Sequence, residues 1–150
     1  MNSNVWILTF ADAISIATTL ILATIGAILT ERSGVINLGV EGILLMGAVT
    51  AFLVGDGTHN LWLALFMSVL VGVAMATVHA ILTITLRANQ IVAGLALVIF
   101  GTGLSQYIGK PVEGKSRPVT IEPMHLGKLS DIPVVGPILF GHDIFTYLTW

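Results

Sequence analysis

The chain has 150 residues, of which 55% are hydrophobic and only 9% are charged, and its mean hydropathy is +0.97. Soluble domains carry about 25% charged residues, so these charges are too few to cover a surface that faces water. The net charge of −2 provides no basic field that would attract nucleic acid. The sequence has no cysteine, which excludes disulfides and thiolate chemistry. The composition therefore indicates an integral membrane protein.

Four apolar stretches are long enough, or nearly long enough, to cross a bilayer, which takes roughly 20 residues in a helix. They cover residues 13–30, 39–55, 61–86 and 88–108. Residues 144–150 begin a fifth apolar stretch that is too short to cross. We therefore expect an all-α fold, in which a single membrane domain forms a polytopic transmembrane helix bundle of about four complete spans and the start of a fifth.

The approach to the second span, residues 33–39, has the glycine and asparagine content of a broken helix. Irregular backbone is tolerated at membrane depth only where protein or a cavity satisfies its polar groups, so a break near residues 31–42 is a candidate functional feature. Asn37 and Glu41 are spaced to share one helical face, if the helix holds there. A carboxylate at membrane depth costs a few kcal/mol. Glu41 therefore either faces water, a partner or a substrate, or lies solvated at the interface.

Other polar residues lie within or beside the apolar stretches. Asn89 and Gln90, at the head of the fourth span, allow the same two interpretations as Glu41. His79 lies inside the third span, and we favour a structural role for it, as a neutral imidazole bonded to a neighbouring helix, over a place on a functional path. His125 and His142 are expected to be solvated loop residues.

The sequence offers no constellation that suits catalysis or metal binding. The histidines lack the spacing of a metal site, and no nucleophile motif occurs. An intramembrane enzyme would need paired polar catalytic groups within the spans, and none is found. We therefore expect no catalytic residue, no metal and no cofactor.

Small residues recur at every fourth position in two of the spans, a pattern that lets helix backbones approach closely in a membrane. The two stripes are Gly72, Ala76 and Ala80 in the third span, and Gly101, Ser105 and Gly109 in the fourth. We expect both stripes to be helix-packing surfaces, as a polytopic bundle requires.

Residues 109–143 contain all five prolines and most of the charges, which indicates a water-exposed loop. The first part of this loop, Gly109 to Ser116, fits the phosphate-binding pattern G-x-x-x-x-G-K-[ST]. That chemistry requires a strand before the motif and a helix after it. An apolar span precedes the motif here, and Pro118 stands where the helix would begin. Nucleotide binding at this motif is therefore not expected.

The segment at residues 31–42, ERSGVINLGVEG, resembles a stretch in permease subunits of ATP-binding-cassette importers for nucleosides and simple sugars. The larger permease group also serves ribose and branched-chain amino acids. Further similar stretches are RANQIVAGLAL at 87–97, GTGLS at 101–105 and IPVVGPIL at 132–139. The resemblance covers most of the chain, in the right order.

This resemblance implies a multi-pass permease of the bacterial plasma membrane that works by alternating access and performs no covalent chemistry. The implied partners are a second permease subunit, two cytoplasmic ATP-binding-cassette ATPase subunits, and an extracytoplasmic solute-binding protein or lipoprotein. The solute would be a nucleoside or a simple sugar, and the motif at 31–37 favours nucleosides. Because broken helices of transporters tend to lie near the substrate path, Asn37 and Glu41 become candidates for lining or bracing it, with Asn89 and Gln90 as further candidates.

The distribution of Lys and Arg and the resemblance imply opposite orientations of the chain in the membrane. The loop 109–143 holds more Lys and Arg than the loops around Arg32 and Arg87, so the positive-inside rule places it in the cytoplasm. The resemblance implies the opposite: an outside N-terminus, the long loop outside, and both arginines inside. We follow the resemblance.

Permeases of this family are considerably longer, and their ATPase-coupling loop follows the fifth span. Residues 1–150 by themselves are therefore not expected to transport, and the chain is expected to be either a fragment or a truncated gene product. A truncated permease could act as a non-transporting membrane scaffold or assembly partner, which is the alternative function.

Overall fold

The computed structural model describes residues 3–116, 119–124, 132 and 134–149. Every regular element in this part of the chain is helical. Four of the helices are apolar and long enough to cross a membrane, as judged by length and composition, which confirms the predicted fold class. These four are α1 (Ser3–Arg32), α2 (Val40–Thr58), α3 (Leu61–Ala80) and α4 (Gln90–Gly109).

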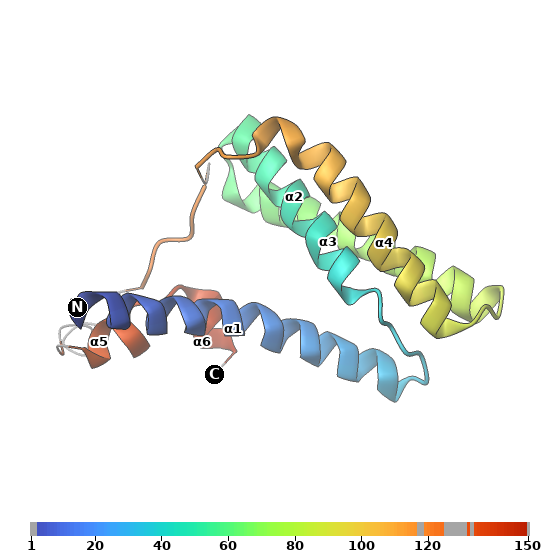
Figure 1. The fold of residues 1–150 in the computed structure, drawn as a ribbon, viewed down its shortest axis with the longest axis horizontal. Helices are drawn as coiled ribbons and strands as arrows, with labels where there is room; N and C mark the ends of the chain where they lie inside the picture. Colours follow the sequence, from blue (N-terminus) through green and yellow to red (C-terminus); the bar gives the residue numbers. More distant parts are fainter. Residues whose placement is uncertain (1–2, 117–118, 125–131, 133, 150) are drawn as a thin grey trace. The chain divides into compact units, whose positions relative to one another are not determined.

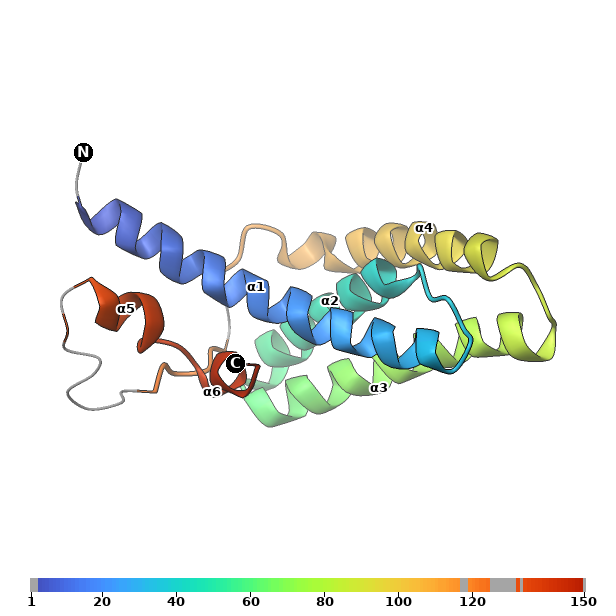
Figure 2. The same ribbon diagram turned by 90° about the horizontal axis from the view of Figure 1, so that it is seen from below.

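The chain divides into two compact units, Met1–Gly26 with Ile121–Trp150, and Ala27–Thr120. The first unit contains the N-terminal part of α1 and two short helices, α5 (Val135–Leu139) and α6 (Ile144–Leu148) (Figure 1). In the second unit, α2, α3 and α4 lie side by side (Figures 1 and 2), with α2 packed against both of the others.

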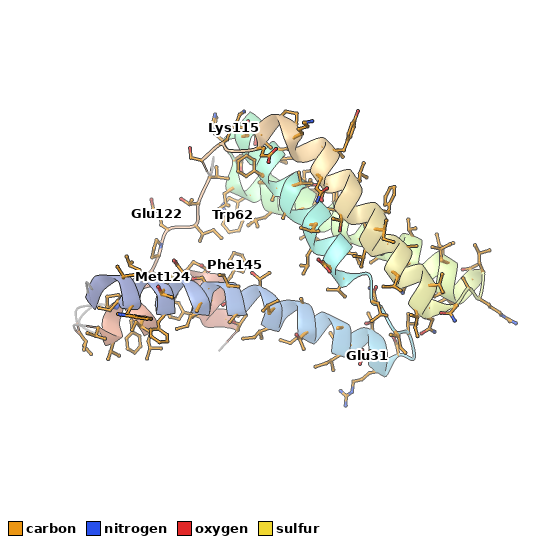
Figure 3. All side chains as sticks on the ribbon, in the orientation of Figure 1. Glu31, Trp62, Lys115, Glu122, Met124 and Phe145 are labelled. Carbon is orange, nitrogen blue, oxygen red and sulfur yellow. The ribbon has the colours of Figure 1, made fainter. Side chains whose placement is uncertain are left out.

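The core of the second unit is small and lies between its three helices. Its buried residues are Met46 from α2, Met75 from α3 and Leu97 from α4. Most other apolar side chains project outward (Figure 3), and Trp62, for example, is 75% exposed. Exposure of this extent would be costly in water. It is expected of helices that lipid or partner helices surround.

The crossing of α2 and α4 depends on glycine, because the two backbones meet directly. A Cβ atom placed on Gly101 would lie 2.6 Å from the carbonyl oxygen of Gly42, and one placed on Gly42 would overlap the carbonyl oxygen of Leu97. Ser105 is also buried, and a Cβ on Gly109 would lie 3.1 Å from Cγ2 of Val49. The predicted stripe of small residues on the fourth span therefore lies along α2.

The predicted stripe on the third span has a different environment. A Cβ on Gly72 would make only an ordinary contact, 3.8 Å from Cγ2 of Ile43. Ala76 is exposed and Ala80 is half-buried. Within the described part of the chain, this stripe is therefore not a close helix contact, and the residue that α3 contributes to the core with Met46 of α2 is Met75.

The helices differ from the predicted spans mainly at their ends. α1 begins at Ser3 rather than near residue 13, and α2 continues to Thr58, so that only two residues connect it to α3. α3 ends at Ala80, where a π-helix, η1 (Ile81–Thr85), continues the chain. A short 3-10 helix, η2 (Lys110–Val112), follows α4.

Candidate functional site

The connection between α1 and α2, residues 33–39, is non-helical as the sequence predicts, and we call it the junction segment. It begins with a helix-ending motif in which Gly34 N–H donates to the Glu31 carbonyl (2.9 Å) and Val35 N–H donates to the Thr30 carbonyl (3.1 Å). This pattern requires a left-handed residue after the helix, and Gly34 supplies it with φ of +84°. Glycine at this position therefore ends α1.

Asn37 lies inside the junction segment, before α2 begins at Val40. Its Oδ1 accepts a hydrogen bond from Gly39 N–H at 2.9 Å, a local bond that competes with helix formation. The helical face that Asn37 and Glu41 were expected to share is therefore not formed. Glu41 occupies the first turn of α2 and is exposed.

Two side chains from elsewhere in the sequence hold the middle of the junction segment. Gln90, at the start of α4, accepts a hydrogen bond from Ile36 N–H at its Oε1 (2.8 Å) and donates from its Nε2 to the Gly34 carbonyl (3.3 Å). His79, at the end of α3, places its Nε2 3.3 Å from the Ile36 carbonyl oxygen. Both polar backbone groups of Ile36 are thus bonded by side chains.

His79 is 2% exposed. Because its partner at Nε2 is a carbonyl, which can only accept, Nε2 must carry the proton. The other ring nitrogen, Nδ1, is buried and has no hydrogen-bond partner within the described residues. The His79 carbonyl accepts the hydroxyl of Thr83, which is also buried, at 2.8 Å. His79 thus bonds to the junction segment rather than to a neighbouring helix.

Asn89 performs a different task from its neighbour Gln90. Its Oδ1 accepts from the N–H groups of Ile91 and Val92, at 3.0 and 3.1 Å. This is helix N-capping, which satisfies backbone donors that have no partner in the first turn. The structure therefore gives Asn89 a role in starting α4, while Gln90 reaches the junction segment.

The junction segment also packs tightly against α4, at glycines that were not among the predicted site or packing residues. A Cβ on Gly94 would lie 2.9 Å from Cβ of Leu38, and a Cβ on Gly39 would lie 2.6 Å from Cδ2 of Leu97. Their signal in the sequence is faint, because a glycine in an apolar stretch gives no hint of which helix it faces.

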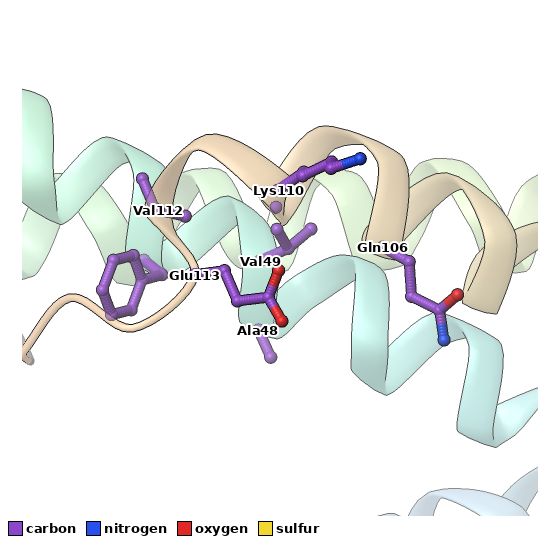
Figure 4. Close-up of a pocket in the computed structure, with 8 residues that line it drawn as sticks. Ala48, Val49, Gln106, Lys110, Val112 and Glu113 are labelled. Carbon is purple, nitrogen blue, oxygen red and sulfur yellow. The ribbon is translucent and has the colours of Figure 1, made fainter.

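A second feature lies at the opposite ends of α2 and α4. A cleft of about 630 Å³ is lined by apolar residues such as Val49 and Phe52, and by the polar side chains of Gln106, Lys110 and Glu113 (Figure 4). Nearby, Lys115 Nζ and Asp56 Oδ2 form an ion pair at 2.8 Å. This pair ties the chain after η2 to the end of α2, but both side chains are partly exposed, so it adds little stability.

One of the two histidines expected to be solvated loop residues differs from expectation. His142, expected to be solvated, is 4% exposed. Its Nε2 lies 2.7 Å from the Ile138 carbonyl and its Nδ1 lies 3.3 Å from Oγ of Ser15. The expectation was wrong because His142 lies against Ser15 of α1 and Ile138 of α5, contacts that the sequence pattern does not reveal. His125 lies outside the described residues.

The phosphate-binding pattern at 109–116 lacks its structural context. Gly109 is the last residue of α4 and η2 follows it, so a helix stands where the pattern needs a strand. Among the described residues, no group of three His, Cys, Asp or Glu side chains could hold a metal ion.

Comparison with known proteins identifies a family over most of the chain. Residues 9–140 match the family model described as "Branched-chain amino acid transport system / permease component". The chain is 39% identical, over 135 residues, to the putative glucose ABC transporter permease protein TsgC13 of Haloferax volcanii, a match that covers 88% of this chain and 41% of that protein. No solved structure matches the chain significantly.

Two further relatives are named for nucleosides. The guanosine ABC transporter permease protein NupQ of Bacillus subtilis is 36% identical over 140 residues, covering 87% of this chain and 44% of its own length. The nucleoside ABC transporter permease protein NupC of Lactococcus lactis is 30% identical over 139 residues, with the same coverage of 87% and 44%. The chain thus spans less than half the length of these curated relatives.

Proposed function

The chain belongs to the family described as the permease component of branched-chain amino acid transport systems, and from this membership we propose that it is part of a permease subunit of an ATP-driven importer for nucleosides or simple sugars. The observation that carries the proposal is the match of most of the chain to relatives named as glucose, guanosine and nucleoside permeases. Four helices that could cross a membrane support it.

In this role the chain carries no chemistry of its own. A cytoplasmic ATP-binding-cassette ATPase hydrolyses ATP, a second permease subunit completes the pathway, and an extracytoplasmic solute-binding protein or lipoprotein delivers the solute. The pair of permeases then works by alternating access. The junction segment, which contains Asn37, and the neighbouring Glu41 are the candidates for lining or bracing the path, and Gln90 is a candidate for bracing it, because non-helical backbone in transporters tends to lie near the substrate.

The proposed orientation places the N-terminus and the loop after α4 outside the cell, and Arg32 and Arg87 inside. In the second unit, α2, α3 and α4 run up and down, so that the junction segment and Arg87 belong to one end and Asp56 and Lys115 to the other. This arrangement supports a separation of the two groups of charges across the membrane.

The test is solute uptake by cells in which the gene encoding this chain is deleted and then restored. The complete gene is used, since the relatives are more than twice the length of the matched region. Uptake of radiolabelled guanosine and of glucose is measured with and without depletion of ATP. We expect ATP-dependent uptake of at least one of the two solutes, lost on deletion and regained on complementation.

The competing function, a non-transporting membrane scaffold or assembly partner, predicts a different pattern. Uptake of both solutes would then be unaffected by the deletion, while the abundance of other membrane complexes would change. A competition series with adenosine, ribose and galactose against the transported label identifies the solute class. Inhibition by nucleosides alone assigns the nucleoside branch, and inhibition by sugars alone assigns the sugar branch.

A further inference from the structure

We propose that His79 and Gln90 are positioning residues that make the junction segment move together with the ends of α3 and α4 during the transport cycle. The inference rests on the proposed transport function for its consequence, but the mechanical part can be measured without transport. Neither residue is proposed to touch the solute.

The hydrogen bonds of Gln90 and His79 hold the backbone of the junction segment. Both side chains bind backbone rather than side chains: Gln90 bonds Ile36 N–H and the Gly34 carbonyl, and His79 bonds the Ile36 carbonyl. The junction segment has no helix to satisfy these groups internally. If the segment separated from either helix, a backbone group would lose its protein partner and the net stabilisation of that hydrogen bond.

Close packing against α4 also holds the junction segment. Beyond Ile36, the segment runs against α4 with no room for a side chain on Gly94, whose Cβ would lie 3.0 Å from the backbone N of Leu38 and 3.2 Å from that of Gly39. The segment is therefore held by polar bonds at Gly34 and Ile36 and by packing at Leu38 and Gly39. Interfaces packed this closely shift as units rather than deforming continuously.

The position of His79 connects the junction segment to α3. It stands on the last turn of α3, directly before the π-helix η1, and its own carbonyl is held by Thr83. Its ring is buried, so it cannot exchange the Ile36 carbonyl for water without moving. His79 thus links the junction segment to α3 as Gln90 links it to α4.

The first measurement follows the mobility of the junction segment itself. This chain contains no cysteine, so Ile36→Cys, in the full-length protein with any cysteine beyond this chain replaced, takes a single nitroxide spin label. Both bonds at residue 36 are made by its backbone, and its side chain is 44% exposed, so the label leaves them intact. The spectrum is recorded in lipid nanodiscs with Gln90→Leu, with His79→Leu and with Thr77→Val.

Thr77→Val is the matched control, because Thr77 lies on the same helix as His79 and its hydroxyl bonds only its own helix, at the Val73 carbonyl. We expect an immobilised spectrum in the parent protein and in Thr77→Val, and a mobile component in Gln90→Leu and His79→Leu. A spectrum that stays immobilised in both leucine variants overturns the proposal that His79 and Gln90 hold the junction segment.

The second measurement is uptake kinetics in the same variants without the label. Loss of one bond is expected to lower the maximal uptake rate by roughly 2- to 10-fold, with KM unchanged, since neither residue is proposed to touch the solute. His79→Gln, whose amide can still donate to the Ile36 carbonyl, should recover most of the rate, whereas His79→Leu should not.

The outcomes separate the two proposals. A mobile label with an unchanged maximal rate overturns the coupling role, and a raised KM with an unchanged maximal rate assigns these residues to solute binding instead. If the parent protein takes up no solute at all, the proposed function fails. The spin-label result still decides whether His79 and Gln90 hold the junction segment.

Discussion

His79 and Gln90 bond to opposite polar groups of one residue, Ile36, although they belong to different helices. His79 holds the carbonyl from the end of α3, and Gln90 holds the N–H from the start of α4. A non-helical segment does not bond its own polar backbone groups as a helix does, so their partners must come from elsewhere. These two side chains satisfy that requirement at the centre of the junction segment.

Because the backbones of α2 and α4 meet directly, one methyl group added at their crossing should lower the stability of the protein. Gly101→Ala places Cβ within 2.6 Å of the Gly42 carbonyl oxygen, and backbone cannot rotate away as a side chain can. We expect a loss of about 1–3 kcal/mol in the free energy of unfolding. Thermal unfolding of the full-length protein in detergent measures this loss.

Gly103→Ala is the matched control on the same helix, because a Cβ at Gly103 meets nothing within 4 Å. There, alanine should stabilise the helix by about 0.5–1 kcal/mol. Equal shifts in the two variants would show that helix propensity, rather than the crossing, sets the response.

The end of α1 depends on the left-handed backbone of Gly34. Gly34→Ala should cost about 1–2 kcal/mol, because Cβ crowds the following carbonyl in this conformation. Gly34→Asn should cost less, since asparagine adopts the conformation more readily. Thermal unfolding is again the measurement, and Gly26→Ala, within α1 and with open space around it, serves as control. A larger loss for Asn than for Ala would contradict the assignment.

Substitutions of Asn89 distinguish a role in capping α4 from a role in binding solute. Its Oδ1 bonds two N–H groups at the start of α4, so Asn89→Ala should cost about 1 kcal/mol and Asn89→Ser much less. We expect Asn89→Ser to keep normal uptake in the complementation assay. Uptake lost in the serine variant, with normal stability and expression, would instead place Asn89 on the solute path.

Glu41 is an exposed carboxylate in the first turn of α2. If it lines or braces the path, Glu41→Leu should reduce uptake severely, while the amount of protein inserted in the membrane stays normal. Glu41→Asp keeps the charge at the helix N-terminus, where it is favourable by about 0.3–1 kcal/mol, and should keep most of the uptake. Unchanged uptake in Glu41→Leu would return Glu41 to a solvated position at the interface.

The proposed orientation can be checked with single cysteines at two exposed serines. Ser116 lies in the chain after η2, and Ser33 is the first residue of the junction segment, directly after α1; each is replaced by cysteine in turn. We expect a membrane-impermeant maleimide to label residue 116 in intact cells and residue 33 only after the cells are opened. The reverse pattern would support the positive-inside assignment of the loop after α4 instead.

Much of the fold follows from local sequence. Long apolar stretches must be helical in a membrane because a helix satisfies its own backbone, and the four long helices are found where those stretches lie. The break at 33–39 was also predictable, because Gly34 and Asn37 both favour non-helical backbone. The element ends were predicted less well, since caps such as Asn89 and the π-helix η1 depend on single bonds.

The candidate site was predictable only in part. Its polar residues stand out in an apolar chain, and Asn37, Glu41, His79, Asn89 and Gln90 could all be singled out from the sequence. Which of them meet could not be known. Gln90 and His79 converge on Ile36 from 54 and 43 residues away, while Asn89, one residue from Gln90, turns to its own helix.

The sequence by itself determined the class of this protein, because composition and hydrophobic length are properties of the chain that no partner changes. It also determined where α1 ends, through the left-handed conformation that Gly34 adopts. The tertiary structure alone decided that the stripe on α4 meets α2, that His142 is buried, and that Ile36 is held from two helices. Those facts depend on which surfaces face each other, and the spacing of residues within one helix carries no information about its neighbour.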